Sequence, residues 1–453
     1  MKYVQKKYVV IALLIATVTG LAYCTKRDQL IEDISLTDNT LYSMKVSAGP
    51  TVQPVSGSAW DGTIDAVWNN AKTLTVHATV PDLGNGTFTG YIGNATDITM
   101  RSMYDATNIY YLVEWNQGQK NVKSALWYYN LTKHLWTQEV TNFTTPVAST
   151  TNGAGTDYNV NSDGTLRPTA AQDQFVMMFN IANSCRSFAT LSCYAACHAN
   201  SSFGTPTTPA GGVMYTNGPT ELLDVWRARM LQVVNTNQVN DCFIDDGSSV
   251  GLGMSGTLDK NEVHSDWQIH NGSSSTVPPL YQSTQAADGG FSNSQTLKMN
   301  NVARTSVKVP IWIIPSGTYN NSAIMLKDTL PGGAAIKVIA VDSMGVLTLA
   351  NSATIDPRVG TDYQQVGAGD GPKCIPGSIV GAYTGSRGDV IANAFYTGTG
   401  WRLLLKRALK TSDTVNDVDF STLSNQFFGI GVMFNGADNQ HAIVSGLTLV
   451  FEK

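Results

Sequence analysis

Two cysteines and a histidine lie close together in Cys193-Tyr194-Ala195-Ala196-Cys197-His198. Two thiols followed at once by an imidazole form the arrangement that holds a c-type haem, because the thiols add to the haem vinyl groups and the imidazole binds the iron. The usual motif has two residues between the cysteines, and this wider variant has three. The motif predicts one covalent haem c, bound by Cys193 and Cys197 with His198 as the proximal ligand. The alternative is a surface loop with a disulfide or two thiols and an unrelated histidine.

The second iron ligand is not evident from the sequence. Methionine thioethers and histidine imidazoles are the usual partners of a proximal histidine. Met230 and His270 rank first among them, and the other residues considered are Met254, His264, Met100 and Met103. For each methionine the competing interpretation is ordinary core packing, which is the commoner role of this side chain.

The N-terminus has the features of an export signal. A cationic start is followed by an apolar run from Tyr8 to Tyr23 and then by Cys24. This order describes a secretory signal, and the residues before Cys24 resemble a bacterial lipobox, in which the cysteine is diacylated. Tyr23 departs from that pattern, which normally has Gly, Ala or Ser there. We expect a lipoprotein signal over residues 1–24, a polar tether over 25–47 and a lipid-anchored, extracytoplasmic protein in the periplasm or at the outer membrane. The alternatives are a plain secreted protein and an apolar run that is retained as a membrane anchor.

The composition limits the remaining possibilities. Only 14% of residues are charged, against roughly 25% in a typical globular protein, which suits an exported domain rich in β-structure and turns. The net charge of −5 provides no basic surface, so nucleic acid is not expected as a partner. No hydrolase or nucleotide-binding motif occurs, and no small-molecule substrate is evident. Cys185, Cys242 and Cys374 remain once the haem and lipid cysteines are assigned, which predicts one disulfide and one spare thiol.

The body of the chain, residues 48–453, has the patterning of short strands joined by Gly, Asn and Asp turns. We expect an antiparallel β-sandwich with long inserted loops. The expected strands cover residues 109–115, 307–314, 335–341, 346–350, 389–396, 401–409, 427–434 and 443–451. Pro310 should place its strand at an edge or a bulge. One helix is expected after the haem motif, with Thr220 as its cap and a body from Glu221 to Val234.

Several blocks together resemble the ethylbenzene dehydrogenase-type haem-binding domain, a family that also supplies the haem subunit of dimethyl-sulfide and chlorate-metabolising molybdoenzymes. The blocks lie in the family's order at residues 97–105, 109–115, 175–181, 385–390, 400–403, 407–409, 417–420 and 427–432, with His441 after them. The resemblance implies a β-sandwich that holds one haem for electron transfer. One departure concerns Trp226-Arg227-Ala228-Arg229, which stands where family members often have a Trp-His-Trp-Lys-like stretch. Neither arginine is a plausible iron ligand, because arginine stays protonated.

Motif, export signal and resemblance together predict a lipid-anchored c-type cytochrome that exchanges single electrons with redox partner proteins. The sequence leaves open whether the protein is itself an enzyme, and it favours an electron-transfer protein or a subunit of an oxidoreductase. Two other hypotheses stay open. The protein is a haem-free lipoprotein that binds carbohydrates or surfaces through the aromatic side chains of Trp127, Tyr128, Tyr129 and Trp136, or it is a haem subunit that works only inside a molybdenum oxidoreductase. Fold alone does not separate these functions.

Overall fold

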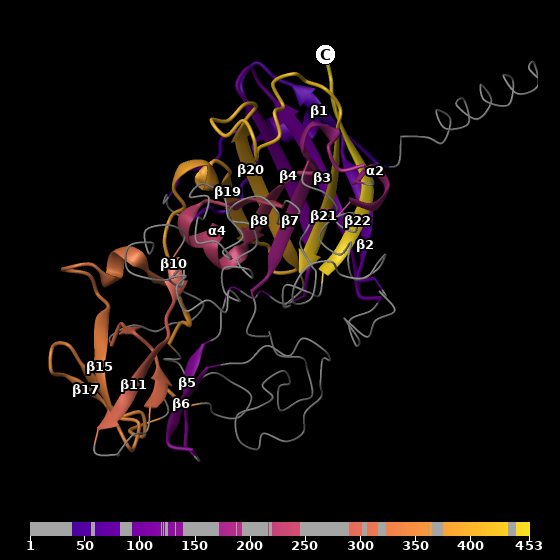
Figure 1. Cartoon of the computed structure of the whole chain (residues 1–453). Coiled ribbons are helices and arrows are strands. Elements are labelled where there is room, and N and C mark those ends of the chain that lie inside the picture. Colours follow the sequence, from indigo (N-terminus) through magenta and orange to yellow (C-terminus); the bar gives the residue numbers. More distant parts are fainter. Residues whose placement is uncertain are drawn as a thin grey trace, which may run out of the picture. The chain divides into compact units, whose positions relative to one another are not determined.

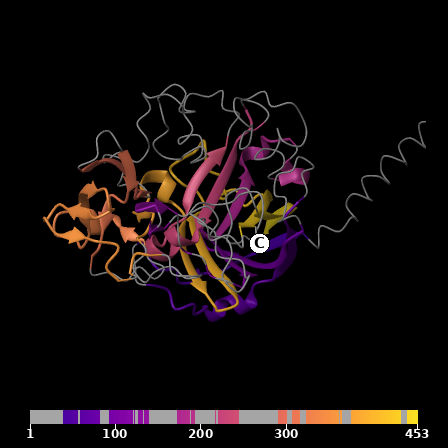
Figure 2. The same cartoon turned by 90° about the horizontal axis from the view of Figure 1, so that it is seen from below.

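The computed structural model is shown in Figures 1 and 2. It describes residues 39–55, 59–81, 93–118, 120, 122, 126–131, 133–138, 172–186, 188–192, 216, 220–244, 290–300, 306–315, 323–360, 362–364, 375–433 and 441–453. Residues 1–40 and 41–453 form separate units by their internal contacts. The fold described below is that of the second unit together with the strand that begins at Thr40.

The largest element is an 11-stranded sheet, whose long strands run side by side in the upper part of Figure 1. In pairing order its strands are β19 (Ile391–Tyr396), β20 (Gly400–Ala408), β4 (Asn108–Asn116), β3 (Ala95–Tyr104), β1 (Thr40–Lys45), β22 (His441–Phe451), β21 (Gln426–Met433), β7 (Gln174–Asn180), β8 (Leu223–Arg229) and β9 (Asn240–Ile244), while β2 (Leu74–Thr79) pairs with β22 and β3. Most neighbours are antiparallel, whereas β1 and β3 are parallel. The prediction of a mainly β, largely antiparallel fold is confirmed.

The sheet folds over so that its two halves pack face to face. Tyr111 of β4 packs against Phe179 of β7 and Trp226 of β8, with ring centroids 6.4 and 5.8 Å apart. These rings lie in one hydrophobic cluster, the main core, to which alternate residues of β4, β20, β7 and β21 contribute. This alternation is expected for strands with one face on a core. The packing of two sheet faces over a common core is that of a β-sandwich.

The two ends of the strand order meet. The peptide N–H of Val239, just before β9, donates to Val390 O at 3.0 Å, and that of Ala392 in β19 donates to Asn237 O at 2.9 Å. Gln238 and Ile391 form a β-bridge between them. The end strands of the large sheet are therefore hydrogen-bonded to each other at this point.

Three smaller sheets complete the described strands. They comprise β10 (Gly290–Ser292), β18 (Ser378–Val380) and β14 (Ile324–Met325); β12 (Ser306–Val309), β11 (Gln295–Asn300), β15 (Ile336–Asp342), β16 (Leu347–Leu349), β17 (Thr354–Ile355) and β13 (Trp312–Ile313); and β5 (Trp127–Asn130) with β6 (Leu135–Gln138). β12 pairs with β11 and ends at Val309, so Pro310 interrupts the expected strand, as predicted for an edge. Trp127, Tyr129 and Trp136 are buried in a hydrophobic cluster with Val338 and Leu347, and Tyr128 is buried as well. The expectation that these four rings form an exposed stacking surface is wrong, because they are used in packing.

The short helices among the described residues are η1 (Ala66–Asn70), η2 (Ile181–Asn183), α2 (Phe188–Leu191), α4 (Met230–Thr236), η4 (Leu326–Thr329) and η5 (Gly385–Gly388). None of these helices is long and apolar enough to cross a lipid bilayer.

The helix expected from Glu221 to Val234 is wrong over most of its length. Leu223–Arg229 is the strand β8, which pairs with β7 on one side and β9 on the other, and only α4 is helical. Six of the seven β8 residues are buried. Both faces of β8 are covered, so its buried positions show no strict alternation, and its apolar residues also fit a helical spacing.

The expected tether also ends earlier than residue 47. Thr40–Lys45 is strand β1, in which Leu41 and Ser43 are fully buried. Ser43 is paired with Ser102 of β3, and the two hydroxyls are 2.9 Å apart. The polar composition of β1 resembles a linker, but its backbone hydrogen bonds in the sheet make it part of the domain.

Candidate functional site

The chain that leads into the haem motif is fixed to the large sheet at Ser192. This residue directly precedes Cys193 and is fully buried. Its hydroxyl donates to Phe428 O of β21 at 3.4 Å and accepts from the peptide N–H of Gly446 in β22 at 3.1 Å. The ideal Cβ of an alanine at Gly429 would lie 2.6 Å from Ser192 Cβ, so this approach requires a residue without a side chain. Cys193, Cys197 and His198 themselves lie outside the described residues, as do His270 and Cys24.

The sheet face beside Ser192 is apolar. Phe188 of α2 packs there in a hydrophobic cluster with Met178 of β7, Val225 of β8 and Ile244 of β9. We call this cluster the α2 cluster. A haem macrocycle is a large apolar ring, so an apolar wall beside the start of the motif fits such a group. Met178 also places a thioether on this face, and this residue was not among the methionines considered from the sequence.

Met230 belongs to a different part of the molecule. It is the first residue of α4, is fully buried, and packs in the main core. Its peptide N–H donates to Asp173 O at 2.9 Å. The main core and the α2 cluster lie on opposite faces of β7 and β8, because the two clusters take alternate residues of these strands. Burial in the main core indicates a packing role for Met230.

The surroundings of the histidines within the described residues give no indication that any of them is an iron ligand. His77 Nδ1 lies 2.7 Å from Asp97 Oδ1 on the surface. The two side chains border an open hollow of about 340 Å³, whose other lining residues include Thr96, Gln117 and Thr399. His134 Nδ1 is 3.4 Å from the Tyr129 hydroxyl. His441 is buried at the start of β22.

Two of the remaining cysteines belong to the same hydrophobic cluster. Cys185 and Cys242 are both buried in the α2 cluster. Cys374 lies outside the described residues. The predicted disulfide within this set of three therefore stays a prediction.

A buried group of charges lies in the main core, and sequence reasoning did not find it as a site. Arg407 of β20 and Asp224 of β8 are fully buried, with Nη1 and Oδ2 2.6 Å apart. Arg407 Nη2 donates to Val418 O, and the Val418 N–H donates to Asp224 Oδ2 at 2.9 Å. The guanidinium also lies over the rings of Trp226 and Phe420, 4.9 and 5.0 Å from their centroids. This pair joins the two halves of the sheet to the loop between β20 and β21.

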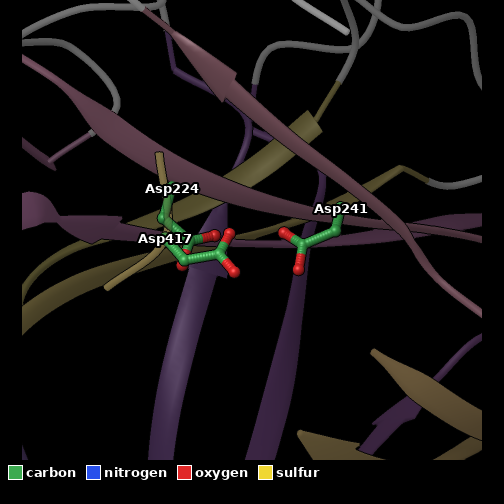
Figure 3. A group of neighbouring side chains, drawn as sticks. All are labelled: Asp224, Asp241 and Asp417. Atoms are coloured by element: carbon green, nitrogen blue, oxygen red, sulfur yellow. The ribbon is translucent and has the colours of Figure 1, made fainter. Parts of the chain in front are cut away.

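Asp241 of β9 and Asp417 of the same loop complete this group. Oxygens of Asp224, Asp241 and Asp417 lie within 4.8 Å of one another, and all three residues are buried (Figure 3). Burial raises the pKa of Asp224 to about 6. The negative charge of Asp417 also raises this pKa, whereas the positive charge of Arg407 lowers it. Burial, together with the charges of Asp224 and Asp417, raises the pKa of Asp241 well above its ordinary value. Burial alone would lower the pKa of Arg407, but the three carboxylates raise it overall.

Two members of this group, Arg407 and Asp224, occupy positions at which their strands direct side chains into the main core. Arg407 is in phase with Trp401, Leu403 and Leu405, whose side chains enter the main core. Asp224 is likewise in phase with Trp226. A charged residue at a core-facing position is rare unless it is paired, and such positions on separate strands indicate a buried ion pair.

A protein-family model described as ethylbenzene dehydrogenase matches residues 65–444. No curated protein matches the chain. Among solved structures, a family 9 carbohydrate binding module from Caldicellulosiruptor kristjanssonii with cellotriose matches at 8% identity and a TM-score of 0.26, covering 91% of this chain and 93% of that chain. The module in complex with glucose gives 8% identity, a TM-score of 0.23 and coverages of 91% and 95%. TM-scores of this size do not establish a common fold. The family match extends from before β2 into β22, and the chain belongs to the ethylbenzene dehydrogenase family.

Proposed function

We propose that this protein is an exported c-type cytochrome, anchored to a bacterial membrane through lipid on Cys24, that relays single electrons to or from a partner oxidoreductase. The observation that carries the proposal is the Cys193-x-x-x-Cys197-His198 motif, which lies inside the family match. The chain enters the motif from Ser192, a residue tied to two strands of the large sheet.

In this proposal different residues of the chain attach the haem and bind its iron. Cys193 and Cys197 form the thioether bonds and His198 provides the proximal imidazole. Bound haem supplies an iron that changes its charge by one electron, and its potential depends on the second ligand, burial and nearby hydrogen bonds. In this proposal the α2 cluster would supply an apolar surface on the side of Ser192.

Covalent attachment is tested by co-expression with cytochrome c maturation factors, followed by a denaturing gel stained for haem peroxidase activity. We expect a stained band at full length, and loss or severe reduction of the stain in Cys197→Ala. The matched control is Cys242→Ala, which removes a thiol from the α2 cluster and should keep the stain. An unstained wild-type band in folded protein would refute the cytochrome proposal.

Anchoring is tested separately by labelling cells with a clickable fatty acid. We expect label on the wild-type protein and none on Cys24→Ser. A mature wild-type protein that starts elsewhere and partitions into the aqueous phase would contradict the lipid anchor, and Tyr23 would be the residue responsible. This result would leave the haem proposal unaffected.

Family membership supports a role beside a larger oxidoreductase, and we propose a molybdenum enzyme as the partner class. The alternative is a haem-free module for carbohydrates, which would use the hollow beside His77, Asp97 and Gln117. Isothermal titration with cello-oligosaccharides separates these alternatives. Saturable heat that disappears in Asp97→Asn, in protein without haem, would favour the carbohydrate module.

A further inference from the structure

The buried carboxylates of Asp224, Asp241 and Asp417 present more negative charge than the described residues compensate. They face one guanidinium, that of Arg407, and all four side chains are at most 1% exposed. If every carboxyl group is ionised, two negative charges remain without a partner. Uncompensated charge in a dry interior is strongly unfavourable, so buried charges are paired, neutralised by a proton or bound to a metal ion.

Five carboxylate oxygens of the group have no hydrogen-bond partner within the described part of the chain. They are Asp224 Oδ1, both oxygens of Asp241 and both oxygens of Asp417. Figure 3 shows the carboxylate of Asp241 directed toward those of the other two residues. The nearest ion-pair distance from Asp417 to Arg407 is 4.0 Å, too long for a hydrogen bond. Arg407 therefore balances the charge of Asp224, and the carboxylate oxygens of Asp241 and Asp417 are available to bind a cation.

A separate observation comes from Tyr111 of β4, on the opposite half of the sheet. This tyrosine is fully buried, and its hydroxyl also lacks a hydrogen-bond partner within the described residues. Burial raises the pKa of this tyrosine, and the charges of Arg407 and Asp224 also act on it. A buried hydroxyl is normally hydrogen-bonded. The carboxylates of three separate segments thus lie together in the main core, and the ring of Tyr111 contacts Trp226, over which Arg407 lies.

We propose that Asp224, Asp241 and Asp417 bind a calcium ion inside the main core, with Tyr111 beside it. The donor set consists of oxygens without sulfur or imidazole, which selects a hard cation. Calcium accepts six to eight oxygens with flexible geometry, whereas magnesium usually retains several water molecules that this enclosed place does not favour. A divalent charge balances the two excess carboxylates.

The ion would act as a structural link. Asp224 and Asp241 belong to the adjacent strands β8 and β9, while Asp417 comes from the loop that follows β20. One ion would fasten that loop to both strands, beside the contacts that Val418 already makes with Arg407 and Asp224. This role is independent of the haem motif and of the proposed electron transfer.

The test uses the purified full chain with and without chelator treatment. Elemental analysis should find one calcium per chain, and calcium should raise the melting temperature of chelated protein. At a hundredfold excess over Kd the shift should be on the order of 5 °C. Terbium added to the chelated protein should show luminescence sensitised by the neighbouring Trp226.

Asp241→Asn keeps the shape of the side chain and removes its charge, so it should abolish the calcium-dependent shift. The matched control is Asp97→Asn on the surface, which should respond as the wild type does. Asp417→Asn, in the loop, provides a second variant if Asp241→Asn does not fold. A wild type that binds neither calcium nor terbium at millimolar concentration would overturn the proposal, and Asp241 would then carry a proton. An undiminished calcium response in both core variants would overturn it equally.

Discussion

Arg407 Nη1 lies 2.6 Å from Asp224 Oδ2 although β20 and β8 stand near opposite ends of the strand order. The contact crosses the main core and exists only when the two halves of the sheet are packed together. Both side chains are fully buried, so neither can turn to water. The ion pair therefore forms only in the folded sandwich, and its loss should be measurable as a loss of folding stability.

Replacement of Arg407 by methionine should destabilise the fold strongly, because it leaves Asp224 buried beside the other carboxyl groups and without its guanidinium partner. Removing one partner of a buried pair typically costs about 3–5 kcal/mol. Denaturant unfolding of the chelated protein measures this loss. The matched control is Arg402→Met on the same strand, whose pair with Glu114 is partly exposed and should lose about 1 kcal/mol or less. Equal losses in the two variants would contradict the buried-charge argument.

Gly429→Ala should disturb the entry to the haem motif, because the added Cβ meets Ser192 Cβ at 2.6 Å. We expect a loss of stability of about 1–3 kcal/mol and a lower yield of covalently attached haem at equal expression. Haem stain per unit of protein is the measurement. Gly118→Ala, whose Cβ meets nothing within 4 Å, should behave as the wild type. Full stain in a folded Gly429→Ala protein would mean that the position of Ser192 does not affect attachment.

The proposed haem should be six-coordinate, with sharp low-spin bands in the reduced protein that change little on addition of carbon monoxide. Met230→Leu should leave this spectrum unchanged, because Met230 packs in the main core and not on the face of β7 beside Ser192. The substitution conserves volume and should cost less than about 1.5 kcal/mol. Carbon monoxide binding that appears in Met230→Leu would instead identify Met230 as an iron ligand. If it appears in Met178→Leu alone, the ligand belongs to the α2 cluster.

Asp105, in the turn between β3 and β4, should make stability depend on acid pH. Burial acts to raise its pKa, but hydrogen bonds from the Thr107 and Asn108 N–H groups and the Tyr110 hydroxyl outweigh it and lower the pKa to about 2. Because the folded pKa is depressed, the contribution is present above the unfolded value near 4 and is lost as the pH falls toward 2.

The measurement is the difference in unfolding free energy between the wild type and Asp105→Asn. After allowance for solvent screening it should be about 1–2 kcal/mol at pH 6, and it should shrink steadily between pH 5 and pH 2. A difference that stays constant across this range would show that the ionised carboxylate makes no special contribution.

Strands with a clear alternation were predictable from sequence, and elements that depend on distant partners were not. Ile109–Trp115 and Trp401–Leu409 match β4 and β20 closely, because one face of each enters the core. Leu223–Arg229 carries no such alternation, and only its pairing with β7 and β9 decides that it is a strand. Asp417 is a loop residue whose burial depends on the packing of two sheet halves. Local pattern could not reveal that this loop returns to the core.

The bridge between Gln238 and Ile391 has a consequence for how the protein behaves at high concentration. An open sheet edge presents unpaired N–H and C=O groups to any other chain that can add a strand. Here the Val239 N–H donates to Val390 O, and the Ala392 N–H donates to Asn237 O. The backbone groups at these positions of the end strands are therefore hydrogen-bonded to each other. Ala392→Pro would remove one of these hydrogen bonds, because proline has no N–H. We then expect the variant to self-associate at high concentration through addition of a strand from another molecule.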